Sequence, residues 1–138
     1  MEIISLIKRL LETRSITGEE NNILIEIEDI IYNTNLEIKR IPVDKDRWNL
    51  IVLKKGKTPG ILFCGHIDTV PSKFSSPKIK DNYLFGLGAS DMKSAIGVFL
   101  KCIQEDPSNY RHGVLVTVGE EKADFDGIIG TAAVPLWV

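Results

Sequence analysis

The amino-acid sequence predicts an α/β fold in which a mixed sheet is flanked by helices. Apolar residues recur at helical spacing at the start of the chain and again after Asp91, and apolar runs of strand length lie between these segments. Two of the runs, Gly60–Cys64 and Gly113–Val118, have the composition of buried strands. Strands and helices that alternate in this way favour a sheet with helices packed on it.

Two helices open the chain. Residues 1–11 form an amphipathic pattern with charges inside the apolar stripe, which distinguishes the segment from a secretion signal. A second helix is expected to begin near Thr17 or Gly18, where acids complement the helix dipole. Its expected buried face is Ile23, Leu24, Ile27, Ile30 and Ile31, and its mostly outward acids are Glu19, Glu20, Glu26, Glu28 and Asp29.

Two strands follow, from Leu36 to Val43 and from Trp48 to Leu53, joined by a polar turn. Residues 71–80 are expected to form a loop. Cys64 and Cys102 are both expected to be small buried residues, although strand alternation puts Cys64 on the same face as His66. Because the two cysteines lie in unlike contexts, no disulfide framework is expected, which is consistent with a reducing cytoplasm.

A histidine and an aspartate follow the first buried strand, in the stretch Gly65–Pro71. Residues i and i+2 of an extended chain face the same side. His66 can therefore offer one ring nitrogen to a cation while Asp68 accepts a hydrogen bond from the other nitrogen. Histidines in apolar surroundings are often only hydrogen-bonded core residues, so this pair needs further ligands to indicate a metal site.

Asp91 stands where a glycine-rich turn meets a helical pattern. Gly86 and Gly88 allow the backbone to bend sharply before it. On propensity alone, Ser90 or Asp91 would cap the helix, and this role is compatible with binding a metal. A dinucleotide-binding loop is rejected, because its third glycine would fall at Asp91, whose charge would repel a pyrophosphate.

Two glutamates follow the strand Gly113–Val118, directly after Gly119. An acidic pair in a turn is ordinary surface chemistry when it stands alone. In open α/β sheets, however, sites form beyond the carboxyl ends of strands, so these glutamates and His66 can meet in one cleft. One glutamate could then bind metal while the other reaches a water held there.

Together, the segments Gly65–Pro71, Gly86–Lys93 and Gly119–Glu121 resemble the zinc-dependent aminoacylases and exopeptidases of metallopeptidase family twenty. Acetylornithine deacetylase, succinyl-diaminopimelate desuccinylase and glutamate carboxypeptidase belong to this family. The order and approximate separations of the motifs also match, and the resemblance extends to about Gly130.

The resemblance implies a role for each matching residue. His66 and Glu121 would each bind one metal ion, and Asp91 would bridge two. Asp68 would orient His66. Glu120 would be the general base that takes a proton from the water bridging the two metal ions as this water attacks the amide carbonyl. Imidazole with carboxylates suits zinc, with cobalt or manganese as substitutes in vitro.

The resemblance also implies that residues 1–138 are the N-terminal portion of a metallohydrolase catalytic domain. An inserted dimerisation or lid domain and the C-terminal portion are expected to lie outside this chain. The remaining ligands of the family have no counterpart here, since His112, Asp124 and Asp126 are expected to be loop residues. The apolar residues 128–138 indicate either a cut before the segment that covers them or a divergent gene end.

The expected function is hydrolysis of amide bonds in N-acyl amino acids or small peptides, with a small-molecule partner, a cytoplasmic location and a homodimer formed through the absent domain. The alternative is an inactive truncated homologue that binds metal or pairs with another chain. A nucleotide-binding domain is a third, weaker possibility. A net charge of −2, from 17 basic and 19 acidic interspersed residues, disfavours nucleic acid, and no stretch is long enough to span a bilayer.

Overall fold

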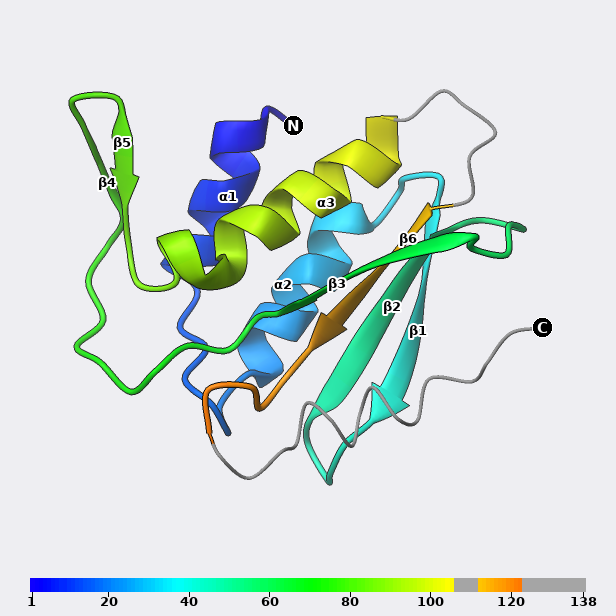
Figure 1. The fold of residues 1–138 in the computed structure, drawn as a ribbon, viewed down its shortest axis with the longest axis horizontal. Helices are drawn as coiled ribbons and strands as arrows, with labels where there is room; N and C mark the ends of the chain where they lie inside the picture. The colour runs from blue at the N-terminus through cyan, green and yellow to red at the C-terminus, as the bar shows by residue number, and fades with distance from the viewer. Residues whose placement is uncertain (106–111, 123–138) are drawn as a thin grey trace.

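The computed structural model describes residues 1–105 and 112–122, and they form the mixed α/β architecture that the sequence predicts. The main sheet has the strand order β1 (Leu36–Pro42), β2 (Trp48–Lys54), β6 (His112–Thr117), β3 (Ile61–His66). Neighbours are antiparallel except β6 and β3, which are parallel. The sheet is therefore mixed, and the parallel pair lies at one side of it (Figure 1).

Three helices cover one face of this sheet. α2 (Asn21–Ile31) and α3 (Ser94–Glu105) contact the strands, and α1 (Ile3–Glu12) packs against both helices (Figure 1). The main core lies between helices and sheet because alternate strand residues point towards the helices. Its buried members include Leu10, Leu24, Ile27, Leu50, Val52, Ile96, Leu100, Val114 and Val116.

The second helix differs from its prediction at the start. It begins at Asn21 rather than near Thr17, and its five predicted apolar residues are all buried, as expected. Glu20 was predicted to point outward, and this was wrong, because its side chain is fully buried. The chain before Asn21 pairs with the segment after β3, since Thr17 donates its backbone N–H to the carbonyl oxygen of Thr69 over 3.2 Å. That pairing draws Glu20 inward, where Arg47 lies 3.4 Å from its carboxylate.

A small hairpin replaces part of the loop expected at residues 71–80. β4 (Lys78–Lys80) pairs with β5 (Tyr83–Phe85) and projects from the body of the molecule (Figure 1). Asp81 and Asn82 connect the two strands with φ values of 49° and 66°. Asparagine and aspartate tolerate this left-handed backbone better than other side chains, which is why two-residue hairpin turns favour them.

Both cysteine predictions were wrong, because Cys64 and Cys102 are exposed. Phe63 stacks on Phe99 of α3, with ring centroids 5.1 Å apart, so its neighbour Cys64 points to the face of β3 that the helices do not cover. Among the described strands β3 has a single neighbour, which leaves its side chains less covered than a central strand's. Cys102 lies on the side of α3 that faces away from the core.

His112 also differs from its prediction. It is the first residue of β6 rather than a loop residue, and its ring centroid lies 5.7 Å from that of Phe63. Asp124, Asp126 and the apolar residues 128–138 lie outside the described residues. No helix in the described part of the chain is long and apolar enough to cross a membrane.

The close approach of α1 to α3 at Gly97 provides a test of the helical layer. A Cβ atom at Gly97 would lie 2.7 Å from Cγ1 of Ile7. We expect Gly97→Leu to lower the free energy of unfolding by about 2 kcal/mol through overpacking, measured by urea denaturation. The neighbouring Val98→Leu is the control, since Val98 is exposed, and a similar loss in both variants would contradict this packing.

Candidate metal centre

The parallel pairing of β3 and β6 brings two of the predicted segments to one edge of the sheet. His66, the last residue of β3, is paired with Thr117, the last residue of β6. The carboxyl ends of β3 and β6 lie at the same edge of the sheet (Figure 1). The Glu120–Glu121 turn therefore follows β6 on the side where His66 ends β3. Oε2 of Glu120 lies 3.7 Å from Nε2 of His66.

The turn η1 (Ala89–Lys93), which lies between β5 and α3, brings Asp91 next to His66. Gly88 precedes the turn with a φ of 80°, and Asp91 itself is extended, so it lies beside α3 and not within it. Met92 packs onto Gly65, where a Cβ atom would lie 2.6 Å from the methionine Cε. Only a glycine at position 65 allows this contact without a shift, and the contact places Asp91 next to His66.

The structure brings His66, Asp91 and Glu121 together. One ligand atom of each lies within 4.8 Å of the corresponding atoms of the other two. Nε2 of His66 is 2.9 Å from Oδ1 of Asp91. A buried imidazole that faces two carboxylates is a donor set for a divalent cation, which would take the place of the ring proton between them. These three residues therefore fit a metal ion.

Asp68 is the buried residue that organises this cluster. Its carboxylate accepts hydrogen bonds from Oγ1 of Thr17 over 2.7 Å, from the amide of Glu121 over 2.9 Å and from the amide of Glu120 over 3.2 Å. Nδ1 of His66 lies 3.0 Å from the backbone carbonyl of Asp68 and 3.5 Å from its carboxylate. Asp68 was expected to orient His66 through its carboxylate, and in the structure its backbone carbonyl makes the shorter contact with the ring. The carboxylate also holds the glutamate turn, which the sequence analysis did not anticipate.

The electrostatics of the cluster follow from these contacts. Burial opposes ionisation of Asp68, but its hydrogen bonds with His66, Glu121, Thr17 and Glu120 lower its pKa to about 2. The hydrogen bond with Asp68, opposed by burial and aided by Asp91, raises the pKa of His66 to about 9. Burial and the nearby carboxylates raise the pKa of Glu121 despite the proximity of His66. The carboxylates therefore make this site attractive to positive charge.

The segment between α1 and α2 forms the back of the site, and sequence reasoning missed it. Oγ of Ser15 donates to the carbonyl of Ile67 over 2.9 Å, and the amide of Thr69 donates to the carbonyl of Ser15 over 2.8 Å. Thr17 adds the bond to Asp68. In the sequence, hydroxyl residues before a helix look like caps, so only the fold reveals these contacts.

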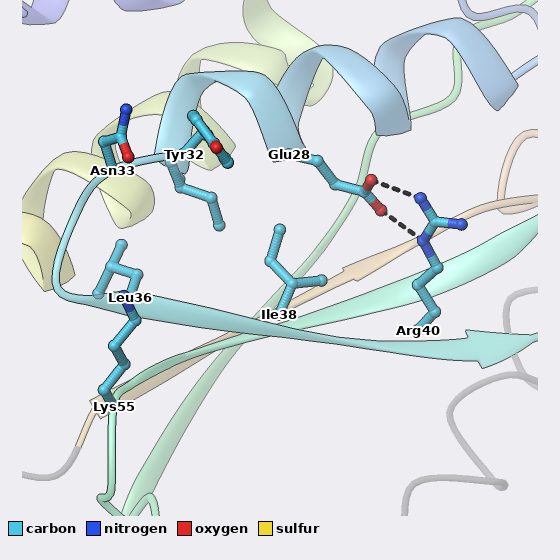
Figure 2. Close-up of a pocket in the computed structure, with 8 residues that line it drawn as sticks. Glu28, Tyr32, Asn33, Leu36, Ile38, Arg40 and Lys55 are labelled. Carbon is cyan, nitrogen blue, oxygen red and sulfur yellow. Dashed lines mark hydrogen bonds and ion pairs between the residues drawn. The ribbon is translucent and has the colours of Figure 1, made fainter.

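A cavity of about 370 Å³ adjoins the cluster. Its lining combines the glycine-rich turn with site residues, namely Thr69, Val70, Gly86, Leu87, Gly88, Ala89, Ser90, Asp91 and Glu121. A larger cavity of about 470 Å³ lies between the end of α2 and β1 (Figure 2). There Arg40 and Glu28 point towards each other and form two hydrogen bonds, so these charges satisfy one another. The smaller cavity is the one beside reactive groups.

Comparison with known families matches the part of the chain that contains the site residues. The family model described as peptidase family M20/M25/M40 matches residues 62–134. The succinyl-diaminopimelate desuccinylase of Corynebacterium glutamicum is 38% identical over 70% of this chain, which corresponds to 26% of that protein. The acetylornithine deacetylase of Proteus mirabilis is 30% identical over 87% of this chain and 36% of that protein. The chain thus spans well under half of these relatives.

Solved structures share the fold. A tripeptidase from Staphylococcus aureus superposes with a TM-score of 0.73 at 24% identity, covering 96% of this chain and 39% of that one. A dinuclear metal binding peptidase from Bacillus subtilis gives a TM-score of 0.64 at 15% identity, covering 94% of this chain and 38% of that one.

The hydroxyl of Thr17 provides a test of how Asp68 is held. We expect Thr17→Val to lower the free energy of unfolding by about 1–3 kcal/mol, because the buried Oδ2 atom of Asp68 loses one of its two donors and keeps only the amide of Glu121. Chemical denaturation measures the change. Thr13→Val is the matched control, since its hydroxyl makes only a partly buried 3.3 Å bond within α1. Equal stability of the two variants would contradict the role of Thr17.

Proposed function

Because the chain belongs to peptidase family M20/M25/M40, we propose that it provides the N-terminal portion of the catalytic domain of a metal-dependent hydrolase that cleaves amide bonds of N-acyl amino acids or small peptides. One observation carries this proposal. His66, Asp91 and Glu121 come from three separate segments of the chain, and their ligand atoms lie within 4.8 Å of one another. Relatives named as a desuccinylase and a deacetylase support the reaction class.

His66, Asp91 and Glu121 are the proposed ligands. Zinc suits one imidazole with carboxylates, and cobalt or manganese would substitute. The second oxygen of the exposed Asp91 carboxylate is free to bind another ion, which fits a two-ion site of the kind named for the Bacillus subtilis peptidase. When bound, divalent cations polarise the scissile carbonyl and make a water more acidic.

Glu120 is the proposed general base. Its side chain is 59% exposed and approaches His66, while its backbone amide is fixed by the carboxylate of Asp68. An exposed carboxylate on an anchored backbone is suited to receive a proton from the attacking water and to deliver it to the leaving amine. The buried Asp68 stays ionised and keeps the imidazole of His66 oriented.

The adjoining cavity of about 370 Å³ is the proposed substrate site. It is lined partly by the backbone of the glycine-rich turn, so a small acyl amino acid or peptide fits it better than a folded protein. Relatives named for diaminopimelate and ornithine favour an acyl group on a diamino acid. The enzyme's partner is then a small molecule.

Separating the two acidic roles tests the proposal. In an intact enzyme that contains this portion, we expect Asp91→Ala to lose bound zinc, and Glu120→Ala to retain zinc while hydrolysis of N-succinyl-diaminopimelate or acetylornithine falls by about 100-fold or more. Elemental analysis measures the metal, and amine release measures turnover. Glu12→Ala, an exposed acid on α1 that pairs with Lys8, is the control.

Equal zinc loss in Asp91→Ala and Glu120→Ala would contradict the assigned roles. Zinc bound without turnover by an intact protein that contains this portion would favour the metal-binding alternative. A wild-type chain that binds no divalent metal would refute the proposed centre.

A further inference from the structure

Lys93 is a charged residue inside the protein. Its side chain is only 1% exposed. Its Nζ atom donates hydrogen bonds to the backbone carbonyls of Leu10, over 3.0 Å, and of Thr13, over 2.6 Å. The last carbonyls of a helix lack intrahelical partners and carry partial negative charge. The ammonium is therefore accommodated by the end of α1.

The rest of Lys93 closes the turn that carries Asp91. The backbone N–H of Lys93 donates to the carbonyl of Gly88 over 2.9 Å. Its aliphatic stem lies against Gly88, since a Cβ atom there would be 3.2 Å from both Cγ and Cδ of the lysine. One residue thus holds both ends of the segment 88–93, and Asp91 lies between them.

The direction of the lysine side chain matters for the metal centre. The two hydrogen bonds of the ammonium go to main-chain carbonyls of Leu10 in α1 and of Thr13 just after it, whereas the carboxylate of Asp91 faces Nε2 of His66. Burial lowers the pKa of Lys93 to about 8, and two hydrogen bonds offset part of that cost. A salt bridge to Asp91 would compete with a cation for its oxygens, and this arrangement avoids such competition.

We propose that Lys93 is a positioning residue, which fixes Asp91 opposite His66 by tying the turn 88–93 to the end of α1. This inference rests on the proposed metal centre. The ammonium of Lys93 bonds to backbone carbonyls and not to the proposed metal ligands. The residue therefore acts through the backbone of the turn. Removing the ammonium leaves two helix carbonyls without a donor and frees the turn to move.

Cobalt binding to the metal-free chain of 138 residues tests this inference, because Co²⁺ reports both affinity and ligand geometry through its visible absorption. We expect Lys93→Met to fold, to bind cobalt about 10- to 100-fold more weakly, as for other residues that orient ligands, and to show an altered spectrum. Lys93→Arg, which keeps a cationic donor, is expected to recover part of the affinity.

Lys101→Met is the matched control. Lys101 of α3 donates to the carbonyl of Met1, just before α1, and pairs with Glu105, but it contacts none of the proposed ligands. Its cobalt affinity and spectrum are expected to equal those of the wild type. Ile27→Val, a core change in α2, controls for loss of stability alone and is expected to leave the spectrum unchanged.

A folded Lys93→Met variant with wild-type affinity and spectrum would overturn the positioning role and leave the proposed function standing. If Lys93→Met does not fold, Lys93→Gln takes its place, since its amide keeps one donor. Cobalt affinity and spectrum are then measured for Lys93→Gln. Weaker binding would support the positioning role, and unchanged binding would contradict it. A wild-type chain that binds no cobalt would instead overturn the metal centre and this inference with it.

Discussion

The hydrogen bonds to the buried carboxylate of Asp68 are the interactions on which the site depends. Three donors from two distant segments converge on this side chain, namely the hydroxyl of Thr17 and the amides of Glu120 and Glu121. The backbone carbonyl of the same residue contacts His66. A charge buried in this way is tolerated only when its donors are in place. The fold must therefore bring these segments together before the carboxylate can be buried.

Three sets of contacts bring the segments of the site together. The parallel pair β3 and β6 brings His66 and the glutamate turn to one edge. The segment before α2 pairs with the residues after β3 and supplies Thr17. The packing of Met92 on Gly65 brings in Asp91. Each contact involves residues far apart in the sequence, so the site forms only when these segments pack together.

The part of the site that lies at strand ends could be predicted from the sequence. Glycine after an apolar run marks where a strand ends, and His66 and the glutamate pair follow such marks, so topology indicated that they could meet. The place of Asp91 at the site was implied only by the family resemblance. Thr17 and Lys93 could not be found in this way. A threonine before a helix is typical of a cap, and an isolated lysine is typical of a surface. Their partners are set by tertiary contacts that no local pattern reveals.

The predictions that failed did so for a related reason. Burial of Cys64 was inferred from its apolar neighbours, but the place of β3 in the sheet decides how far its outer face is covered. Exposure of Glu20 was inferred from its charge, but backbone pairing next to the site draws the residue inside. The apolar face of α2 was predicted correctly, because its five residues recur at helical spacing.

Amide hydrogen exchange at Glu120 and Glu121 tests the central role of Asp68 most directly. If the buried carboxylate holds the turn, both amides are protected in the wild-type chain and lose protection in Asp68→Asn, which replaces one acceptor oxygen by a donor, while amides within β6 stay protected. Rapid exchange of both amides in the wild type, or unchanged protection in the variant, would contradict the account.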